Sequence, residues 1–329
     1  AAAGLGELKE NTLIKNIEGT FDSPVQWEKD FTADEEFICP GVAGRYFKNV
    51  TNKESPPWLQ QRLKAIGLRP ISALVDITNY ITYDLGRPLH VYDADKISGN
   101  LKMRYAKENE HCLTLDEENR ECTTDMIVIS DDKQLHGIGG IMGGFDSGCS
   151  LETKNVFLET ALFDPISVTK TGRYLKLQSD ARYRFERGID PTSIKWGVQA
   201  ATKMILDLCG GEASKPVQTP ILEDRRHTFD FNTNKIKSLG GVDVRKDKQK
   251  TILESLGFDV IERNNLFNIT VPSFRPDIEG EADIVEEILR IYGFNQIPLT
   301  NVSDHTNKKT VLSSELKSFY KIKRSIANT

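Results

Sequence analysis

Long hydrophobic runs and paired cysteine motifs are both missing from this sequence. The apolar stretches are far too short to cross a bilayer, and the N-terminal AAAGLGELKE has no basic region followed by an apolar one. The cysteines are odd in number and form no CxxC pair: Cys39, Cys112, Cys122, Cys149 and Cys209. This pattern predicts neither a disulfide framework nor a zinc site, and it favours the reducing cytoplasm.

Two catalytic signatures are missing as well. No serine lies in a GxSxG turn, and no GxxxxGK(S/T) loop is present to hold the phosphates of a nucleotide. An acyl-enzyme serine hydrolase and a P-loop nucleotide-binding protein are therefore not favoured.

An excess of positive charge is also absent. The 329 residues carry 43 basic and 48 acidic side chains, a net charge of −5, so the chain as a whole does not attract polyanions. Any contact with RNA must be local. The best local candidate interleaves basic and aromatic residues: Arg173, Lys176, Arg182, Arg184 and Arg187 with Tyr174, Tyr183 and Phe185. From composition alone, a solvated and salt-bridged segment is the favoured alternative.

What is present is ordinary globular material, with 38% hydrophobic and 8% aromatic residues and enough length for two domains. Residues 37–50 and the alternating apolar runs between 101 and 163 predict strands. Helices are predicted at 55–66, 71–83 and 192–209, because their apolar residues share one face and a glycine follows each of them.

Composition changes at 214–226, where two prolines and mixed charge predict a boundary. Beyond it, the segments 236–239 and 248–256, the strand 266–271 and a helix at 281–291 predict a compact helical unit with a β hairpin. We therefore expect an α+β chain, in which a mixed-sheet domain precedes a small α+β domain.

Three separated motifs carry a family resemblance. They are RPISALVDITNYITYDLGRPLHVYD at 69–93, GIGGIMGG at 137–144 and FLETALFDPISVTKTGRYLKLQSDARYRFERGIDP at 157–191. Together they resemble the bacterial-type phenylalanyl-tRNA synthetase beta subunit, in the part that edits mischarged tRNA. The resemblance implies a domain end and linker at 1–36, an editing domain at 37–213, a linker at 214–225, a winged-helix-like domain at 226–296 and the start of a catalytic-like module at 297–329.

The resemblance also implies a function. A synthetic pocket that suits phenylalanine rejects a side chain with one extra hydroxyl only ~10²-fold, so errors must be removed later. The chain is therefore expected to hydrolyse Tyr-tRNA(Phe) in the cytoplasm and to support tRNA binding, while ATP and amino acid activation belong to the alpha subunit of an α2β2 assembly. The alternative is a non-catalytic scaffold that docks tRNA and the alpha subunit around a vestigial pocket.

Two pairs of residues are expected to form the reacting part of the pocket. Glu159 lies among apolar residues in FLETALF and matches the acceptor for the tyrosine hydroxyl, although the residues alone favour the wet face of an edge strand. Gly143 matches a glycine that lies against the bound side chain. His90 and Asn79 match residues beside the hydrolytic water, although a lone histidine is more often structural.

Three further residues match the rim of the pocket. Arg69 matches an arginine that meets the tRNA end, and Ser179 and Ala181 match two small residues that shape the entrance. Many relatives carry threonine in place of Ser179, so a methyl group is missing here while the hydroxyl remains.

A second cluster is acidic. Asp283, Glu286 and Glu287 are spaced to share a helix face, and Asp277 lies one loop upstream. Hard oxygen ligands of this kind suit Mg²⁺, but from sequence alone an acidic first turn stabilised by the helix dipole is the favoured explanation. The resemblance implies a magnesium site shared with the alpha subunit, so this chain alone is expected to bind the ion weakly or not at all.

Overall fold

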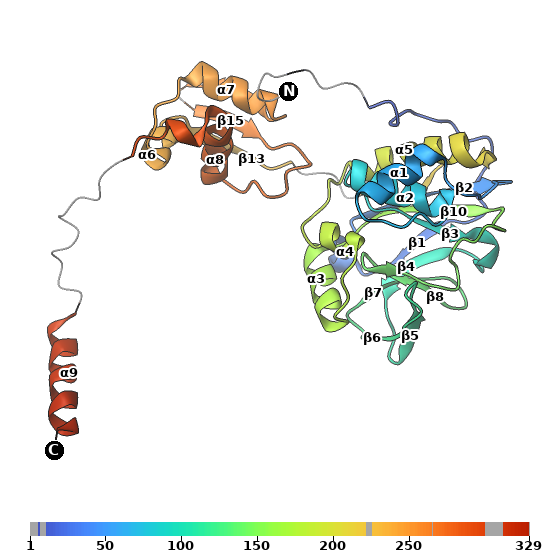
Figure 1. The fold of residues 1–329 in the computed structure, drawn as a ribbon, viewed down its shortest axis with the longest axis horizontal. Helices are drawn as coiled ribbons and strands as arrows, with labels where there is room; N and C mark the ends of the chain where they lie inside the picture. The colour runs from blue at the N-terminus through green and yellow to red at the C-terminus, as the bar shows by residue number, and fades with distance from the viewer. Residues whose placement is uncertain (1–5, 7–10, 222–225, 265, 300–311, 329) are drawn as a thin grey trace.

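The computed structural model describes residues 6, 11–221, 226–264, 266–299 and 312–328. These residues form an N-terminal body of two packed sheets with helices, a smaller C-terminal body and a separate terminal helix (Figure 1). The α+β class predicted from the sequence is confirmed. No helix in the described ranges has the length and apolar content to span a membrane.

The first sheet of the N-terminal body contains the strand that begins the fold. Its order is β1 (Trp27–Asp30), β4 (Leu101–Tyr105), β7 (Ile127–Ser130), β8 (Leu135–Ile138) and β9 (Met142–Gly143). β1 runs parallel to β4, and the other neighbours are antiparallel. A separate hairpin joins β5 (Glu110–Leu113) to β6 (Asn119–Cys122).

The second sheet is antiparallel and lies at the centre of the body. Its order is β11 (Glu212–Ala213), β2 (Gly41–Lys48), β10 (Val156–Leu162) and β3 (His90–Asp93), and β12 (Val217–Gln218) also pairs with β2. Every residue of β10 is buried, because β10 pairs with a strand on each side and both faces of the sheet are covered. The strand is therefore apolar nearly throughout, as a strand covered on both faces must be.

Alternate residues of β10 face two different cores. Phe157 and Ala161 pack with the first sheet, whereas Leu158 and Leu162 pack against helices. Those helices are α1 (Pro57–Ala65), α2 (Ala73–Asp84) and α5 (Ser193–Cys209). In Figure 1 they lie on one side of β2, β10 and β3, while β4, β7 and β8 lie on the other. Glu159 has the parity of Phe157 and Ala161, so its side chain points between the sheets.

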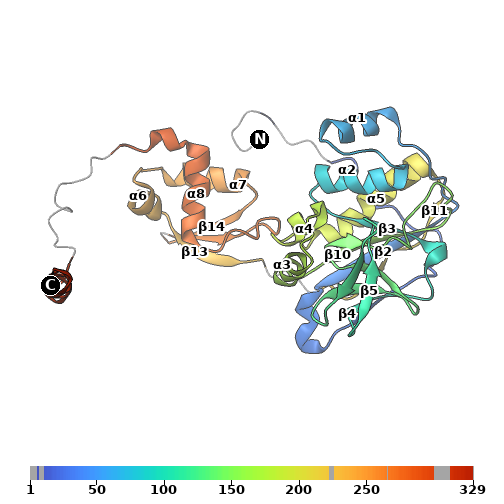
Figure 2. The ribbon, with the colours of Figure 1, turned by 60° about the horizontal axis from the view of Figure 1, so that its bottom comes forward.

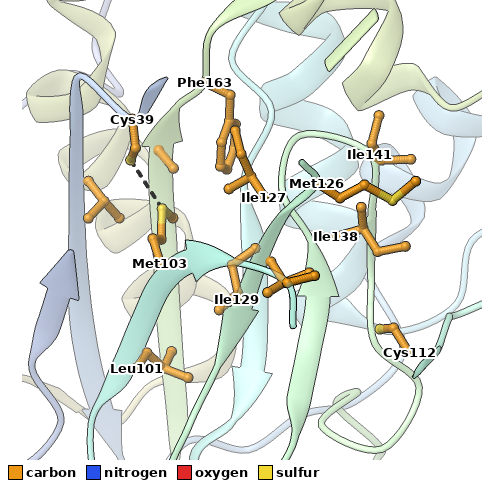
Figure 3. Packing of buried hydrophobic residues seen from close by; sticks show 14 of the residues in the cluster. Cys39, Leu101, Met103, Cys112, Met126, Ile127, Ile129, Ile138, Ile141 and Phe163 are labelled. Atoms are coloured by element: carbon orange, nitrogen blue, oxygen red, sulfur yellow. Dashed lines mark hydrogen bonds between the residues drawn. The ribbon is translucent and has the colours of Figure 1, made fainter. Parts of the chain in front are cut away.

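Large apolar side chains fill most of the space between the two sheets. Figure 3 shows Met103 of β4, Ile127 and Ile129 of β7, and Phe163 directly after β10 meeting there. Burying each of these side chains contributes about 1.5–3 kcal/mol. The sulfur of Cys39 reaches the sulfur of Met103 across this core.

Two helices that were not predicted follow β10: α3 (Pro165–Tyr174) and α4 (Asp180–Phe185). Asp164 and Ser179 cap them, each accepting a hydrogen bond from a backbone N–H of the first turn. The predicted helices at 55–66, 71–83 and 192–209 are confirmed with bounds shifted by one or two residues. The strand predicted from residue 37 is wrong at its start, because 33–38 form a 3-10 helix.

Segments on either side of residues 37–213 also pair with the sheets of the N-terminal body. β1 lies before residue 37 yet pairs with β4. Ser214 and Thr219 lie in the expected linker yet are buried against β2. Backbone pairing holds these polar segments in place, and composition does not reveal such pairing.

The C-terminal body combines a three-stranded sheet with helices. Its elements are β13 (Thr228–Asn232), α6 (Lys235–Gly240), α7 (Lys246–Ser255), β14 (Asp259–Arg263), β15 (Leu266–Thr270) and α8 (Glu281–Tyr292). The predicted hairpin is β14 and β15, and β13 adds a strand on the other side of β15. Pro276 of this body lies against Gly188 of the two-sheet body, whereas α9 (Ser314–Ala327) stands apart from both in Figures 1 and 2.

Candidate active site

A cavity of about 80 Å³ opens where the two sheets meet α4. This is well above the roughly 10–15 Å³ that a cavity needs to hold one water molecule. Its walls are largely apolar and include four residues of the core in Figure 3: Ile129, Ile138, Ile141 and Phe163. Three polar side chains interrupt these walls, namely His90, Tyr92 and Glu159. Such a lining suits an aromatic ligand with a polar end.

Glu159 is a buried carboxylate in this cavity. Its side chain belongs to the central strand β10, opposite His90 of β3, and the residue is only 7% exposed. Burial raises the pKa of Glu159 to about 7, while the Tyr92 hydrogen bond and the charge of Arg87 act in the opposite direction. The edge-strand alternative for Glu159 is therefore wrong.

Tyr92 holds this carboxylate from within the protein. Its hydroxyl donates a hydrogen bond to Oε2 of Glu159. Burial, with the nearby carboxylate, raises the pKa of Tyr92 well above its ordinary value, so the phenol remains a donor. Tyr92 was not identified from the sequence, although the alternation in HVYD places it on the same face of β3 as His90.

His90 contributes an uncharged imidazole to the cavity. Burial, together with the nearby His136, lowers its pKa to about 4. Its Nε2 atom is buried and has no hydrogen-bond partner among the described residues. A neutral ring nitrogen without a partner can bind a water molecule or a polar group of a ligand.

The glycine segment passes directly beside this imidazole. Gly143 lines the cavity, and a β-carbon at this position would overlap the ring of His90. Gly140 lines it too and has a φ of +69°, a conformation that side chains with a β-carbon rarely adopt. Gly143 therefore lacks a side chain because its backbone lies close to His90, and Gly140 lacks one because of its backbone conformation.

Helix α4 closes one side of the cavity. Ala181 lines it directly. Ser179 does not line it, but its hydroxyl donates to the carbonyl of Ile141 at 2.6 Å and accepts from the N–H of Arg182 at 3.0 Å. Ser179 thus joins the start of α4 to a cavity wall, and its hydroxyl is the group that matters for this contact.

Two predicted site residues lie outside the cavity lining. Asn79 is a partly buried residue of α2, and Arg69 is exposed in the segment before α2. The structure therefore brings together His90, Gly143, Glu159 and Ala181, with Ser179 immediately behind them.

The predicted basic and aromatic segment divides into structural and exposed members. Arg182 is buried and donates to the carbonyls of Gly172 at 3.1 Å and Leu177 at 2.6 Å. It cannot contact RNA, so the prediction was wrong for this residue. Arg184 lies over the ring of Tyr83, whereas Arg173 and Arg187 are exposed.

The four predicted magnesium ligands do not converge. Arg275 donates to Asp277 at 2.6 Å and to Glu287 at 2.9 Å. Asp283 instead accepts hydrogen bonds from the backbone N–H groups of Glu279 and Gly280, just before its own helix, and Glu286 is exposed. Within the ranges that the structure covers, no three His, Cys, Asp or Glu side chains are placed to hold a metal ion. These residues alone do not fit Mg²⁺, and a site completed by another subunit stays a prediction.

Comparison with known proteins identifies two domains. Residues 38–210 match the B3/4 domain family, and residues 229–294 match the tRNA synthetase B5 domain. The phenylalanine–tRNA ligase beta subunit of Brucella suis biovar 1 (strain 1330) is 47% identical over 308 residues, which are 93% of this chain and 38% of the relative. That of Mesorhizobium japonicum is 44% identical over 323 residues, 96% of this chain and 39% of the relative. The chain thus spans about two fifths of the length of these curated relatives.

One solved structure is a weaker match. An N-terminal fragment of the phenylalanyl-tRNA synthetase beta subunit from Pyrococcus horikoshii is 15% identical, with a TM-score of 0.40, over 84% of this chain and 77% of that chain. At this score the match supports no conclusion about the site.

Proposed function

The chain belongs to the B3/4 domain family, and on this premise we propose that it is the editing part of a phenylalanine–tRNA ligase beta subunit. In this proposal the cavity accepts the tyrosyl group of mischarged Tyr-tRNA(Phe), and the ester to the terminal ribose is hydrolysed. The relatives named above carry the beta-subunit name, and the B5 match follows the B3/4 match in the same chain.

The observation that carries the proposal is a buried carboxylate in a largely apolar cavity. A tyrosyl hydroxyl can donate to the oxygen of Glu159 that Tyr92 does not occupy, whereas phenylalanine would leave that desolvated oxygen without a donor. Leaving a buried polar group unpaired costs about 1–3 kcal/mol, and more for a charged group. The cavity therefore selects for the hydroxyl that a synthetic pocket rejects poorly.

Hydrolysis needs little beyond correct placement of a water molecule. The ester of an aminoacyl-tRNA is already activated, so no protein nucleophile is required. The unpartnered Nε2 of His90 can hold a water or the ester near the cavity, and the ribose hydroxyl can assist. Asn79 and Arg69 lie outside the lining, so we assign them to the approach of the tRNA end rather than to the reacting atoms.

The remaining roles follow from the proposed subunit. ATP and amino acid activation belong to the alpha subunit of an α2β2 enzyme in the cytoplasm, and tRNA(Phe) is the RNA partner. A Mg²⁺ site shared with the alpha subunit remains part of this proposal; of its four expected ligands Asp277, Asp283, Glu286 and Glu287, only Asp277 and Glu286 are exposed to a partner.

A non-catalytic scaffold is the second candidate. The positions of Asn79 and Arg69 outside the cavity favour it, since a working site should gather all its predicted residues. Convergence of His90, Gly143 and Glu159 on one cavity favours the hydrolase, because a scaffold has no need for it.

Glu159→Ala in the complete enzyme tests the proposal. Formation of Phe-tRNA should be unchanged, while Tyr-tRNA should accumulate because its clearance is lost. Glu152→Ala is the matched control, because Glu152 is exposed and lies outside the cavity. Undiminished clearance of Tyr-tRNA by the Glu159 variant would leave the scaffold as the better account.

A further inference from the structure

Tyr92 places a phenol on Glu159 before any ligand enters. The Tyr92 hydroxyl donates to Oε2 of the carboxylate, and the tyrosine is 1% exposed. Its ring packs edge to face against two imidazoles, with ring centroids 4.5 Å from His90 and 6.2 Å from His136. Close packing around the buried ring therefore holds the hydroxyl in place.

The second oxygen of Glu159 is in a different situation. Among the described residues, Oε2 accepts a hydrogen bond from Tyr92, whereas Oε1 accepts none. Oε1 does not belong to the fully buried atoms that lack a partner, so it is not completely enclosed by protein. Since Glu159 lines the cavity, Oε1 is the oxygen that retains access to the open space. An ionised carboxylate is an acceptor at both oxygens, so the two atoms can serve two different phenols.

We propose that Tyr92 is a specificity-determining residue that fixes Glu159 through Oε2 and reserves Oε1 for the hydroxyl of an incoming tyrosyl group. The inference rests on the proposed editing function, and it adds a residue that positions the carboxylate of Glu159 for recognition of the tyrosyl hydroxyl. The resident phenol cannot leave, so the carboxylate has one vacant acceptor position with a set direction.

The charges around Glu159 show why the hydroxyl of Tyr92 is needed. Arg87, from the segment before β3, is buried and donates to the carbonyl of Ala161 at 2.5 Å rather than to Glu159. His90 of β3 is neutral near pH 7, His136 of β8 contacts Tyr92 rather than the carboxylate, and the buried thiol of Cys39 remains protonated. Tyr92 is thus the direct donor to the carboxylate among the described residues. Without it, the ionised form loses its hydrogen bond and protonation becomes easier.

Tyr92→Phe in the complete enzyme tests the inference. The hydrolysis rates of Tyr-tRNA(Phe) and Phe-tRNA(Phe) are compared as kcat/KM between pH 6 and 9. We expect the preference for tyrosine to fall roughly tenfold near pH 7 and to recover as the pH rises, because the carboxylate then ionises without help. Tyr105→Phe is the control, because Tyr105 lies outside the cavity and should leave both the preference and its pH profile unchanged.

A second measurement applies even if the variant is less stable. Carbon-13 NMR of labelled glutamate carboxyls follows the titration of Glu159 directly, and Tyr92→Phe should move its midpoint to higher pH. An unchanged midpoint and an unchanged preference would overturn the role of Tyr92. If Glu159→Gln also leaves the clearance of Tyr-tRNA intact, the editing function itself fails; if Glu159→Gln abolishes clearance and Tyr92→Phe changes nothing, only the inference fails.

Discussion

Gly143 and His90 lie so close that a β-carbon on residue 143 would occupy the space of the imidazole ring. Gly143→Ala should therefore displace the ring and slow the hydrolysis of Tyr-tRNA by about 10²-fold, the effect expected of a 1 Å misplacement in an active site. The cost in stability should be about 1–3 kcal/mol, because the added atom overpacks a closed region. Single-turnover deacylation and denaturant unfolding measure the two effects.

Gly280→Ala is the matched control for this substitution. A β-carbon at Gly280 meets no atom within 4 Å, and the residue lies in the C-terminal body. The control should keep the full rate of deacylation. If Gly143→Ala keeps it as well, the contact between Gly143 and His90 has no functional role.

The two titratable groups of the cavity make stability depend on pH in opposite directions. Burial raises the pKa of Glu159 from an ordinary 4.5 to about 7. The stability that the buried, protonated carboxyl contributes is therefore lost as the pH rises through this interval. Burial lowers the pKa of His90 from an ordinary 6.5 to about 4, so its contribution is lost as the pH falls through that interval. Each change is about 3 kcal/mol, and the two largely cancel in the unmodified protein.

Single variants should separate these two contributions. Relative to the unmodified chain, Glu159→Gln should gain stability as the pH rises from 4.5 to 7, because glutamine has no charge to bury. His90→Gln should gain stability as the pH falls from 6.5 to 4. Urea unfolding at a series of pH values measures both differences. Curves that stay parallel to that of the unmodified chain would contradict the burial of these groups.

The elements and half of the site could be predicted from the sequence, but pairwise contacts could not. Local periodicity and capping glycines are enough to place α1, α2 and α5, and the motifs are enough to single out His90, Gly143 and Glu159. Tyr92 was missed because its contact with Glu159 depends on the register of β3 against β10, which are 67 residues apart at this point.

Arg182 shows the same limit for charge. It belongs to a basic run, and composition treats every member of such a run as surface. Only the packing of α3 against α4 shows that its guanidinium lies inside, bonded to backbone carbonyls. Composition is limited in a related way for β1, since strand pairing across the whole domain retains a segment that is polar locally.

Arg182→Ala should cost about 3 kcal/mol or more in the free energy of unfolding. The substitution removes a buried cation together with its hydrogen bonds to the carbonyls of Gly172 and Leu177 and to the carboxylate of Glu186. Arg173→Ala is the control, because Arg173 is exposed and should change stability by no more than about 0.5 kcal/mol. Denaturant unfolding compares them, and equal losses would show that Arg182 is no more structural than Arg173.

The acidic cluster should not bind Mg²⁺ in this chain by itself. Two of its carboxylates, Asp277 and Glu287, are already paired with the guanidinium of Arg275, and those contacts hold the pKa of both below their ordinary values. A magnesium ion would have to displace a cation that is fixed by four hydrogen bonds. Calorimetric titration should therefore show no saturable binding at millimolar Mg²⁺, and EDTA should leave the melting temperature unchanged.

Arg275→Met separates the role of the guanidinium from that of a metal. Glu287 is buried and keeps only Arg290 as a cationic partner in this variant, so loss of Arg275 should destabilise the C-terminal body by about 1–3 kcal/mol. The loss should be present above the ordinary carboxylate pKa of 4.5 and should shrink as the pH falls, because protonated Glu287 no longer needs a cation. Restoration of stability to the variant by Mg²⁺ would show that the carboxylates can hold the ion once Arg275 is gone. Saturable binding to the unmodified chain would instead mean that Arg275 is displaced readily, and the pairing described above would then be too weak to exclude a metal.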